Sequence, residues 1–91
     1  MKLFKSVDDK FKDLGFVKIR DDKYIVEYSR NNKEFNFVQR LDIVHKASGN
    51  HIVQSYDMDL MDKKSIGNTC VGLTYKELKL IIKKMRQKGW Y

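Results

Sequence analysis

The sequence predicts a single α+β domain over residues 1–91, a two-layer sandwich with two helices on one face of an antiparallel sheet. Apolar residues recur at helical spacing near both ends of the chain. Between these ends lie short apolar stretches with the two-residue alternation of strands, separated by turn-forming residues. The predicted order is α-β-β-β-β-(β)-α, a meander of four strands with residues 69–73 as a candidate fifth strand.

The first predicted helix spans about residues 6–14. Ser6 is a suitable N-cap, and Asp8 and Asp9 in the first turn interact favourably with the helix dipole. Gly15 suits the left-handed position that ends many helices. The apolar residues form one stripe at i, i+4 and i+7: Val7, Phe11 and Leu14.

Three turns predict the strand pairing that follows. Residues 21–22 (two aspartates) and 31–32 (two asparagines) each suit a two-residue turn. The third turn lies within residues 47–50, where a three-residue loop would have Gly49 in the left-handed conformation. The predicted opposite pairs are Ile19 with Tyr24, Val17 with Val26, Tyr28 with Phe35, Val26 with Phe37, His45 with His51, and Ile43 with Val53.

These registers agree on which side chains share a face of the sheet, and a slip of one residue would destroy the agreement. One face is apolar and is expected to lie under the helices: Val17, Ile19, Tyr24, Val26, Tyr28, Phe35, Phe37, Leu41, Ile43 and Val53. The other face is mixed, with Lys18, Lys23, Glu27, Glu34, Arg40 and Asp42 around Ile25, Val38, Val44 and Ile52.

Residues 55–68 are polar and are interpreted as a loop. Its aspartates at positions 57, 59 and 62 lack the glycine and distal glutamate of a calcium-binding EF-hand loop, so we expect them to be solvated. Cys70 is the single cysteine, which excludes an internal disulfide, and is expected to be buried.

The last predicted helix begins at Thr74, which forms the Thr-x-x-Glu pattern of a capping box with Glu77, and ends at Gly89. Trp90 and Tyr91 are expected to pack over the edge of the core. The apolar face of this helix is predicted to comprise Tyr75, Leu78, Ile81, Ile82 and Met85.

The opposite side of this helix is a candidate binding surface, because the chain's net charge of +7 is concentrated at its C-terminal end. Residues 74–91 carry six basic side chains and one acidic side chain. Cations in the last turns also stabilise a helix without any partner, and this simpler interpretation stays open. The residues expected to project outward for an acidic protein or a nucleic acid are Lys76, Lys79, Leu80, Lys83 and Lys84.

His45 and His51 are the weak candidates for a metal site. The predicted register places them opposite each other, but a stable zinc site needs three or four protein ligands. A four-residue loop that pairs Lys46 with His51 would instead put the histidines on opposite faces. With no complete catalytic constellation, we expect no cofactor and no enzymatic activity.

A family resemblance rests on three stretches of the sequence. These are "KFKDLGF" at 10–16, "HKASGNHIVQSYD" at 45–57 and "VGLTYKELKLIIKKMRQKGW" at 71–90. In the order of these features the chain resembles small uncharacterised proteins of phages and prophages of Gram-positive bacteria. The resemblance implies a bacterial cytoplasmic setting and a small accessory role. It implies no chemistry.

The expected function is a non-enzymatic binding module that contacts a host or phage protein, with nucleic-acid binding as the alternative and a metal-dependent enzyme ranked last. Neither a membrane-spanning apolar run nor a signal peptide is recognisable, so we expect a cytoplasmic protein without a membrane partner. A homodimer could form through an exposed strand edge or through a patch of Ile25, Val38, Val44 and Ile52.

Overall fold

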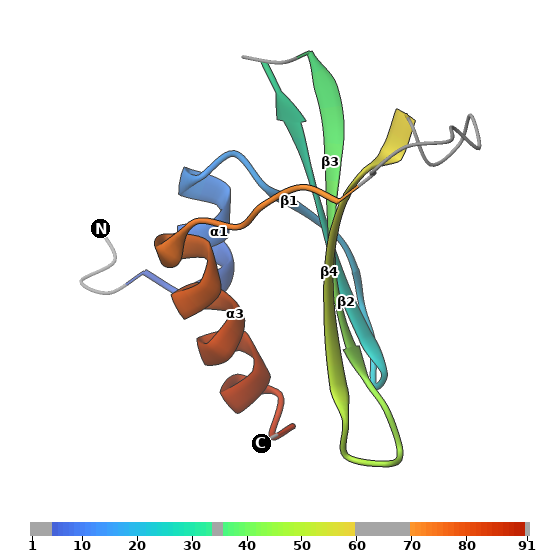
Figure 1. Cartoon of the computed structure of the whole chain (residues 1–91). Helices are drawn as coiled ribbons and strands as arrows, with labels where there is room; N and C mark the ends of the chain where they lie inside the picture. The colour runs from blue at the N-terminus through green and yellow to red at the C-terminus, as the bar shows by residue number, and fades with distance from the viewer. Residues whose placement is uncertain (1–4, 34–35, 60–69, 91) are drawn as a thin grey trace.

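The computed structural model describes residues 5–33, 36–59 and 70–90, and it confirms the predicted α+β architecture. Both helices lie on the same side of a four-stranded antiparallel sheet whose order is β1-β2-β3-β4 (Figure 1). The elements are α1 (Val7–Asp13), β1 (Val17–Asp21), β2 (Ile25–Asn32), β3 (Phe37–His45), β4 (His51–Asp57) and α3 (Tyr75–Gln87).

Both helices begin where the sequence predicts, each with a capping box. The Ser6 hydroxyl accepts a hydrogen bond from the Asp9 backbone N–H, and Thr74 does the same for Glu77. These bonds satisfy N–H groups that have no partner within the helix. Gly15 and Gly89 follow the helices with φ angles of 92° and 72°, as their predicted helix-ending positions require.

The core lies between the helices and the two central strands. The rings of Phe11 and Tyr28 stack with centroids 4.2 Å apart, and Phe16 meets Phe11 edge to face. Burial of each such apolar side chain stabilises the fold by roughly 1.5–3 kcal/mol. The buried apolar residues are Phe11, Phe16, Val26, Tyr28, Leu41, Ile43, Leu80, Ile81 and Trp90.

The third hairpin has the predicted register. His45 lies opposite His51 and Ile43 opposite Val53, and Gly49 has a φ angle of 85° in the connecting turn. The three-residue loop is therefore correct, and the alternative that separates the histidines is wrong.

The second hairpin has a different register from the predicted one. The asparagines at 31–32 belong to β2, and the last pair before the turn is Asn32 with Phe37. Val26 consequently lies opposite Ile43, and Tyr28 opposite Leu41. The β3 residue opposite Val26 or Tyr28 thus lies an even number of positions further along the chain than predicted. Because side chains alternate with a period of two, the side chains of β2 and β3 stay on the predicted faces of the sheet. Phe35 and Glu34 lie outside the described residues.

The first hairpin also departs from prediction, because its turn lies two residues later. The Asp22 carboxylate accepts hydrogen bonds from the backbone N–H groups of Tyr24 and Ile25 and so closes the turn there. Asp21 pairs with Val26, and Tyr24 is exposed rather than part of the apolar face.

A bulge at Ile19 changes which side chains of β1 face the helices. Lys18 lies opposite Tyr28, whereas Arg20 lies opposite Glu27, so one extra residue stands between them. Lys18 thereby joins the face of Tyr28. Val17 and Ile19, predicted to be core residues, are 61% and 46% exposed.

The last helix is rotated relative to the predicted orientation. Tyr75, Leu78 and Ile82, which were expected to face the sheet, are 74%, 45% and 44% exposed. Glu77 and Lys84 are buried in their place. Glu77 forms an ion pair of 3.0 Å with Arg30, which is the type of partner that a buried carboxylate requires.

The end of β4 and the segment at Cys70 also differ from the prediction. Ser55–Asp57, expected in a loop, continue the strand. Cys70, expected to be buried, is exposed and forms a single β-bridge with Tyr56 in place of the candidate fifth strand. Asp62 lies outside the described residues.

Candidate functional site

A groove runs between the two helices and brings together lysines from both. It encloses about 230 Å³. We call it the lysine groove; its lining residues are Lys10, Asp13, Leu14, Lys76, Lys79, Leu80 and Lys83.

Helical periodicity explains the α3 side of this groove. Lys76, Lys79 and Lys83 follow each other at i, i+3 and i+7 and so share one side of the helix. All three are exposed, as the sequence predicts. Leu80, predicted to be an outward contact, is only 8% exposed and forms part of the groove's lining together with Leu14.

Lys10 of α1 is the residue that sequence reasoning missed. It lies close enough to Lys83 that its positive charge lowers the pKa of Lys83, with smaller contributions from direct contact with Lys10, from burial and from Lys79. The sequence contains no signal for this pair, because the two lysines meet only through the packing of α1 against α3.

The acidic residue of the groove is already neutralised. Asp13 forms an ion pair of 2.6 Å with Lys5. The described lining residues therefore include four lysines and one carboxylate, and that carboxylate is already paired with Lys5 outside the groove lining. Such an arrangement attracts anions, because a bound negative charge relieves the repulsion between the ammonium groups.

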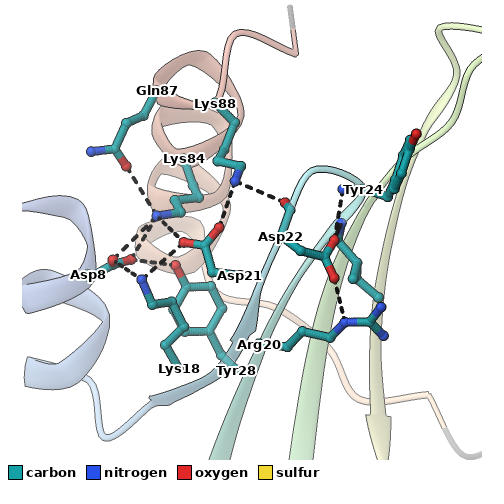
Figure 2. A network of polar contacts seen from close by, with 11 residues as sticks. Asp8, Lys18, Arg20, Asp21, Asp22, Tyr24, Tyr28, Lys84, Gln87 and Lys88 are labelled. Atoms are coloured by element: carbon teal, nitrogen blue, oxygen red, sulfur yellow. Dashed lines mark hydrogen bonds and ion pairs between the residues drawn. The ribbon is translucent and has the colours of Figure 1, made fainter.

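Lys84 does not belong to this surface, contrary to the sequence prediction. It is 3% exposed and lies beneath the helices, where Figure 2 shows its amino group pointing toward Asp8 and Asp21. The Lys84 Nζ donates hydrogen bonds to Asp8 Oδ1 at 3.1 Å and to Gln87 Oε1 at 3.2 Å, and it lies 3.4 Å from Asp21 Oδ2. This lysine is a structural residue.

Several elements contribute to the polar cluster around Lys84, which comprises Asp8, Lys18, Asp21, Tyr28, Lys84 and Lys88. Asp8 also accepts hydrogen bonds from the Tyr28 hydroxyl at 2.7 Å and from Lys18 at 2.8 Å. Asp21 accepts from Lys18 at 3.0 Å and from Lys88 at 2.7 Å. Each carboxylate thus meets several donors, which is the pattern of a structural network.

The pKa values of the cluster follow from these contacts. Burial alone would raise the pKa of Asp8, but hydrogen bonds from Lys18, Tyr28 and Lys84 outweigh it and lower the pKa. The pKa of Asp21 is also well below its usual value, because Lys88 and Lys18 outweigh the effect of burial. Burial, followed by the Asp8 carboxylate, holds the pKa of Tyr28 far above its usual range.

The histidine pair lies at the end of the sheet under Trp90. The Nδ1 atoms of His45 and His51 are 3.1 Å apart, and the indole of Trp90 stacks on His45 with ring centroids 5.1 Å apart. In the described part of the chain, no group of three His, Cys, Asp or Glu side chains is placed to bind a metal. The pair therefore forms a hydrogen-bonded, aromatic-stacked end to the core.

The proposed self-association patch lies on the face of the sheet that the described helices leave uncovered. Ile25, Val44 and Ile52 form one row across three strands, and each is partly buried. Val38 lies further along, beyond rows that contain Asp42 and Arg40. The structure thus joins three of the four predicted residues.

Asp42 is an unusual buried group on this same face. It is 7% exposed, its Oδ2 accepts a hydrogen bond of 2.9 Å from the Tyr56 hydroxyl, and its Oδ1 has no hydrogen-bond partner. Burial raises the pKa of Asp42. Burial and the neighbouring carboxylate raise the pKa of Tyr56 to about 12.

Comparisons with protein-family models, with curated proteins and with solved structures find no match for this chain. Neither helix in the described residues has the length and apolar content needed to cross a membrane.

Proposed function

We propose that this chain is a non-enzymatic binding module that holds an acidic segment of a partner protein in the lysine groove. The observation that carries the proposal is the groove itself, in which Lys10 of α1 lines the same cavity as Lys79 and Lys83 of α3. The positive charge of Lys10 also lowers the pKa of Lys83. Two ammonium groups that repel each other gain most when a carboxylate of a partner binds between them.

The lining of the groove favours a protein over a nucleic acid. Leu14 and Leu80 give it an apolar portion that an apolar side chain next to the partner's carboxylates can contact. The described lining residues include no aromatic ring on which a base could stack and no arginine for bidentate phosphate contacts. Nucleic-acid binding through Lys76, Lys79 and Lys83 is the second candidate, since their spacing along α3 suits a row of phosphates.

The biological setting is also a proposal, and it rests on the resemblance to phage and prophage proteins. That resemblance supports an accessory role in the cytoplasm of a bacterial host, with a host or phage protein as the partner.

Binding assays with defined probes test this function. The probes are a fluorescent peptide of glutamates interspersed with leucines, a peptide in which glutamine replaces each glutamate, and a DNA duplex. We expect the acidic peptide to bind and the glutamine peptide not to bind. Lys83→Glu should weaken acidic-peptide binding at least about tenfold, because it replaces attraction by repulsion.

Lys46→Glu is the matched control, since Lys46 is an exposed lysine of the third hairpin and the charge change is identical. Lys46→Glu should leave the affinity nearly unchanged. Binding of the duplex alone, with a log–log salt slope of about −0.9 per neutralised phosphate, would replace the protein partner by a nucleic acid. No binding of any probe at low salt would refute the groove as a binding site.

A further inference from the structure

The rotation of α3 leaves a row of apolar side chains on the outer surface of the helix. Tyr75, Leu78 and Ile82 follow each other at i, i+3 and i+7 and so share one side of α3, which we call the α3 stripe. All three are exposed, whereas Glu77 and Lys84 of the same helix are buried. A contiguous exposed apolar surface of this kind is typical of a site that contacts another molecule.

The α3 stripe runs beside the lysines of the lysine groove. Each residue of the stripe is followed directly in the sequence by one of these lysines: Lys76, Lys79 and Lys83. One position corresponds to a rotation of about 100° around the helix axis, so the two rows lie next to each other along α3. Lys79 joins them, because its Nζ lies 5.1 Å from the centre of the Tyr75 ring and its side chain also lines the lysine groove.

A second groove, of about 480 Å³, continues the apolar surface from α3 to β4, and we call it the β4 groove. Leu78 of the α3 stripe lines it from the helix, and Val53, which is 38% exposed, lines it from the sheet. The segment that leads from Cys70 to α3, orange in Figure 1, contributes Val71 and Leu73. No charged side chain is present among the described residues of this lining.

We infer that the acidic partner segment is an amphipathic helix that lies along α3. Its apolar side contacts the α3 stripe and enters the β4 groove, and its carboxylates face Lys79 and Lys83. A helical partner presupposes the proposed function, since its carboxylates bind the lysine groove, and it adds a second contact surface.

The geometry of α3 favours a helix as the occupant. A helix can present an apolar row and an acidic row on adjacent sides, which is the arrangement that the two rows of α3 complement. The 13 residues of α3 extend over about 20 Å, so a partner helix of about four turns matches its length. The β4 edge suits an added strand less well, because the Val71 N–H already donates to the Ser55 carbonyl and only residues 51–54 precede this bond.

Charge complementarity favours an acidic partner over a second copy of this chain or a nucleic acid. The chain carries a net charge of +7, and lysines flank the α3 stripe, so a second copy would bring like charges together. A nucleic acid would find cations on the lysine side only, because the stripe and the described lining of the β4 groove offer none to its phosphates. An acidic amphipathic helix complements both surfaces.

Two matched peptides test whether the partner must be helical. The first is a fluorescent peptide with leucines at helical spacing and glutamates on the adjacent side. The second replaces one alanine in its middle by proline, which breaks the helix and keeps every charge and every leucine. We expect the helical peptide to bind at least about tenfold more tightly and to gain helical circular dichroism on mixing with the protein. Equal affinities would overturn the inference.

Variants of the α3 stripe test where the apolar side of the peptide binds. Ile82→Ser should weaken binding of the helical peptide at least about fivefold, because it removes apolar contact without changing the charge. Ile19→Ser is the matched control on β1, since Ile19 is 46% exposed and Ile82 is 44% exposed, and it should leave the affinity unchanged. Equal effects of the two substitutions would contradict docking on the stripe.

A second matched pair keeps the test decisive if Ile82→Ser fails to fold, as judged by circular dichroism. Tyr75→Ser changes the most exposed residue of the stripe and should also weaken binding of the helical peptide. Tyr24→Ser changes an exposed tyrosine in the first hairpin and should have no effect. Equal effects of these two substitutions would again contradict docking on the stripe.

The helical partner and the proposed function fail in different ways. If both peptides bind alike, Lys83→Glu weakens both and Ile82→Ser weakens neither, the lysine groove still binds acidic segments and only the helical partner is overturned. If replacement of every glutamate by glutamine leaves the affinity of the helical peptide unchanged, the proposed function is overturned, and the acidic helix with it. Binding of a DNA duplex without binding of the helical peptide would overturn both in favour of a nucleic acid.

Discussion

Lys84 and Asp8 are separated by 76 positions in the chain, and their side chains meet at 3.1 Å beneath the two helices (Figure 2). This contact joins the last helix to the first and orients α3 with a lysine toward the protein interior. A buried ammonium requires anionic partners, and Asp8 and Asp21 supply them.

Lys84→Met should therefore destabilise the fold, because it leaves two carboxylates with one cation fewer. We expect a loss of roughly 1–3 kcal/mol in the free energy of unfolding, less than for a fully buried pair because Lys18 and Lys88 remain. Urea denaturation measures this. Lys76→Met, an exposed lysine of the same helix, should change stability by less than about 0.5 kcal/mol, and equal effects would show that Lys84 is not structural.

Acid should unfold the protein through the same cluster. The pKa values of Asp8 and Asp21 are lower in the folded chain than in the unfolded chain, so the unfolded chain binds more protons as the pH falls. Their stabilisation is fully present above the unfolded pKa of about 4 and is lost as the pH falls through the folded values.

Thermal melts between pH 6 and pH 2 check this dependence. The wild-type melting temperature should fall by about 5 °C or more over the acidic part of the range. Asp21→Asn should melt lower at neutral pH and show a shallower pH dependence. An unchanged slope would mean that Asp21 does not contribute to acid unfolding.

Asp42 should show the opposite behaviour. Its pKa is higher in the folded chain, so the folded chain binds more protons and stability decreases as the pH rises through the folded pKa. Asp42→Asn removes the buried charge and keeps an oxygen that can accept the Tyr56 hydrogen bond. We expect it to raise stability at pH 7 by roughly 1 kcal/mol, measured by denaturation. A decrease would indicate that the ionised carboxylate is required.

The third hairpin offers a test of backbone conformation alone. Gly49 has a φ angle of 85°, and a methyl group there would meet no atom within 4 Å. Gly49→Ala should therefore cost about 1–2 kcal/mol through left-handed strain and not through a clash. Gly72→Ala has equal space and no positive φ, so it should be close to neutral or slightly stabilising in the same thermal melts.

The strand order could be predicted from the sequence, and so could the face of the sheet on which most strand side chains lie, because both depend on local patterns. The alternation of β2 and β3 survives a shift of the second turn, since an even shift keeps Val26, Tyr28, Leu41 and Ile43 on one face. The third register followed from the left-handed requirement at a single glycine, and it was correct.

The errors share a different physical origin. The bulge at Ile19 places Val17 on the opposite face of the sheet from the predicted one. No residue type in β1 indicates from the sequence where this bulge occurs. The rotation of α3 depends on ion pairs of Glu77 with Arg30 and of Lys84 with Asp8, whose partners are distant in sequence. Apolar periodicity therefore predicted the wrong orientation of the helix. The contribution of Lys10 from α1 to the lysine groove was missed for the same reason.

The distance along the chain between Lys84 and Asp8 also bears on the order of folding. The sheet is a meander in which each strand pairs with its neighbour in sequence, so its contacts close short loops. Joining α3 to α1 closes nearly the whole chain and should come after the transition state. Lys84→Met should then accelerate unfolding and leave the folding rate nearly unchanged in stopped-flow experiments, which would make this helix contact a determinant of how long the folded state persists.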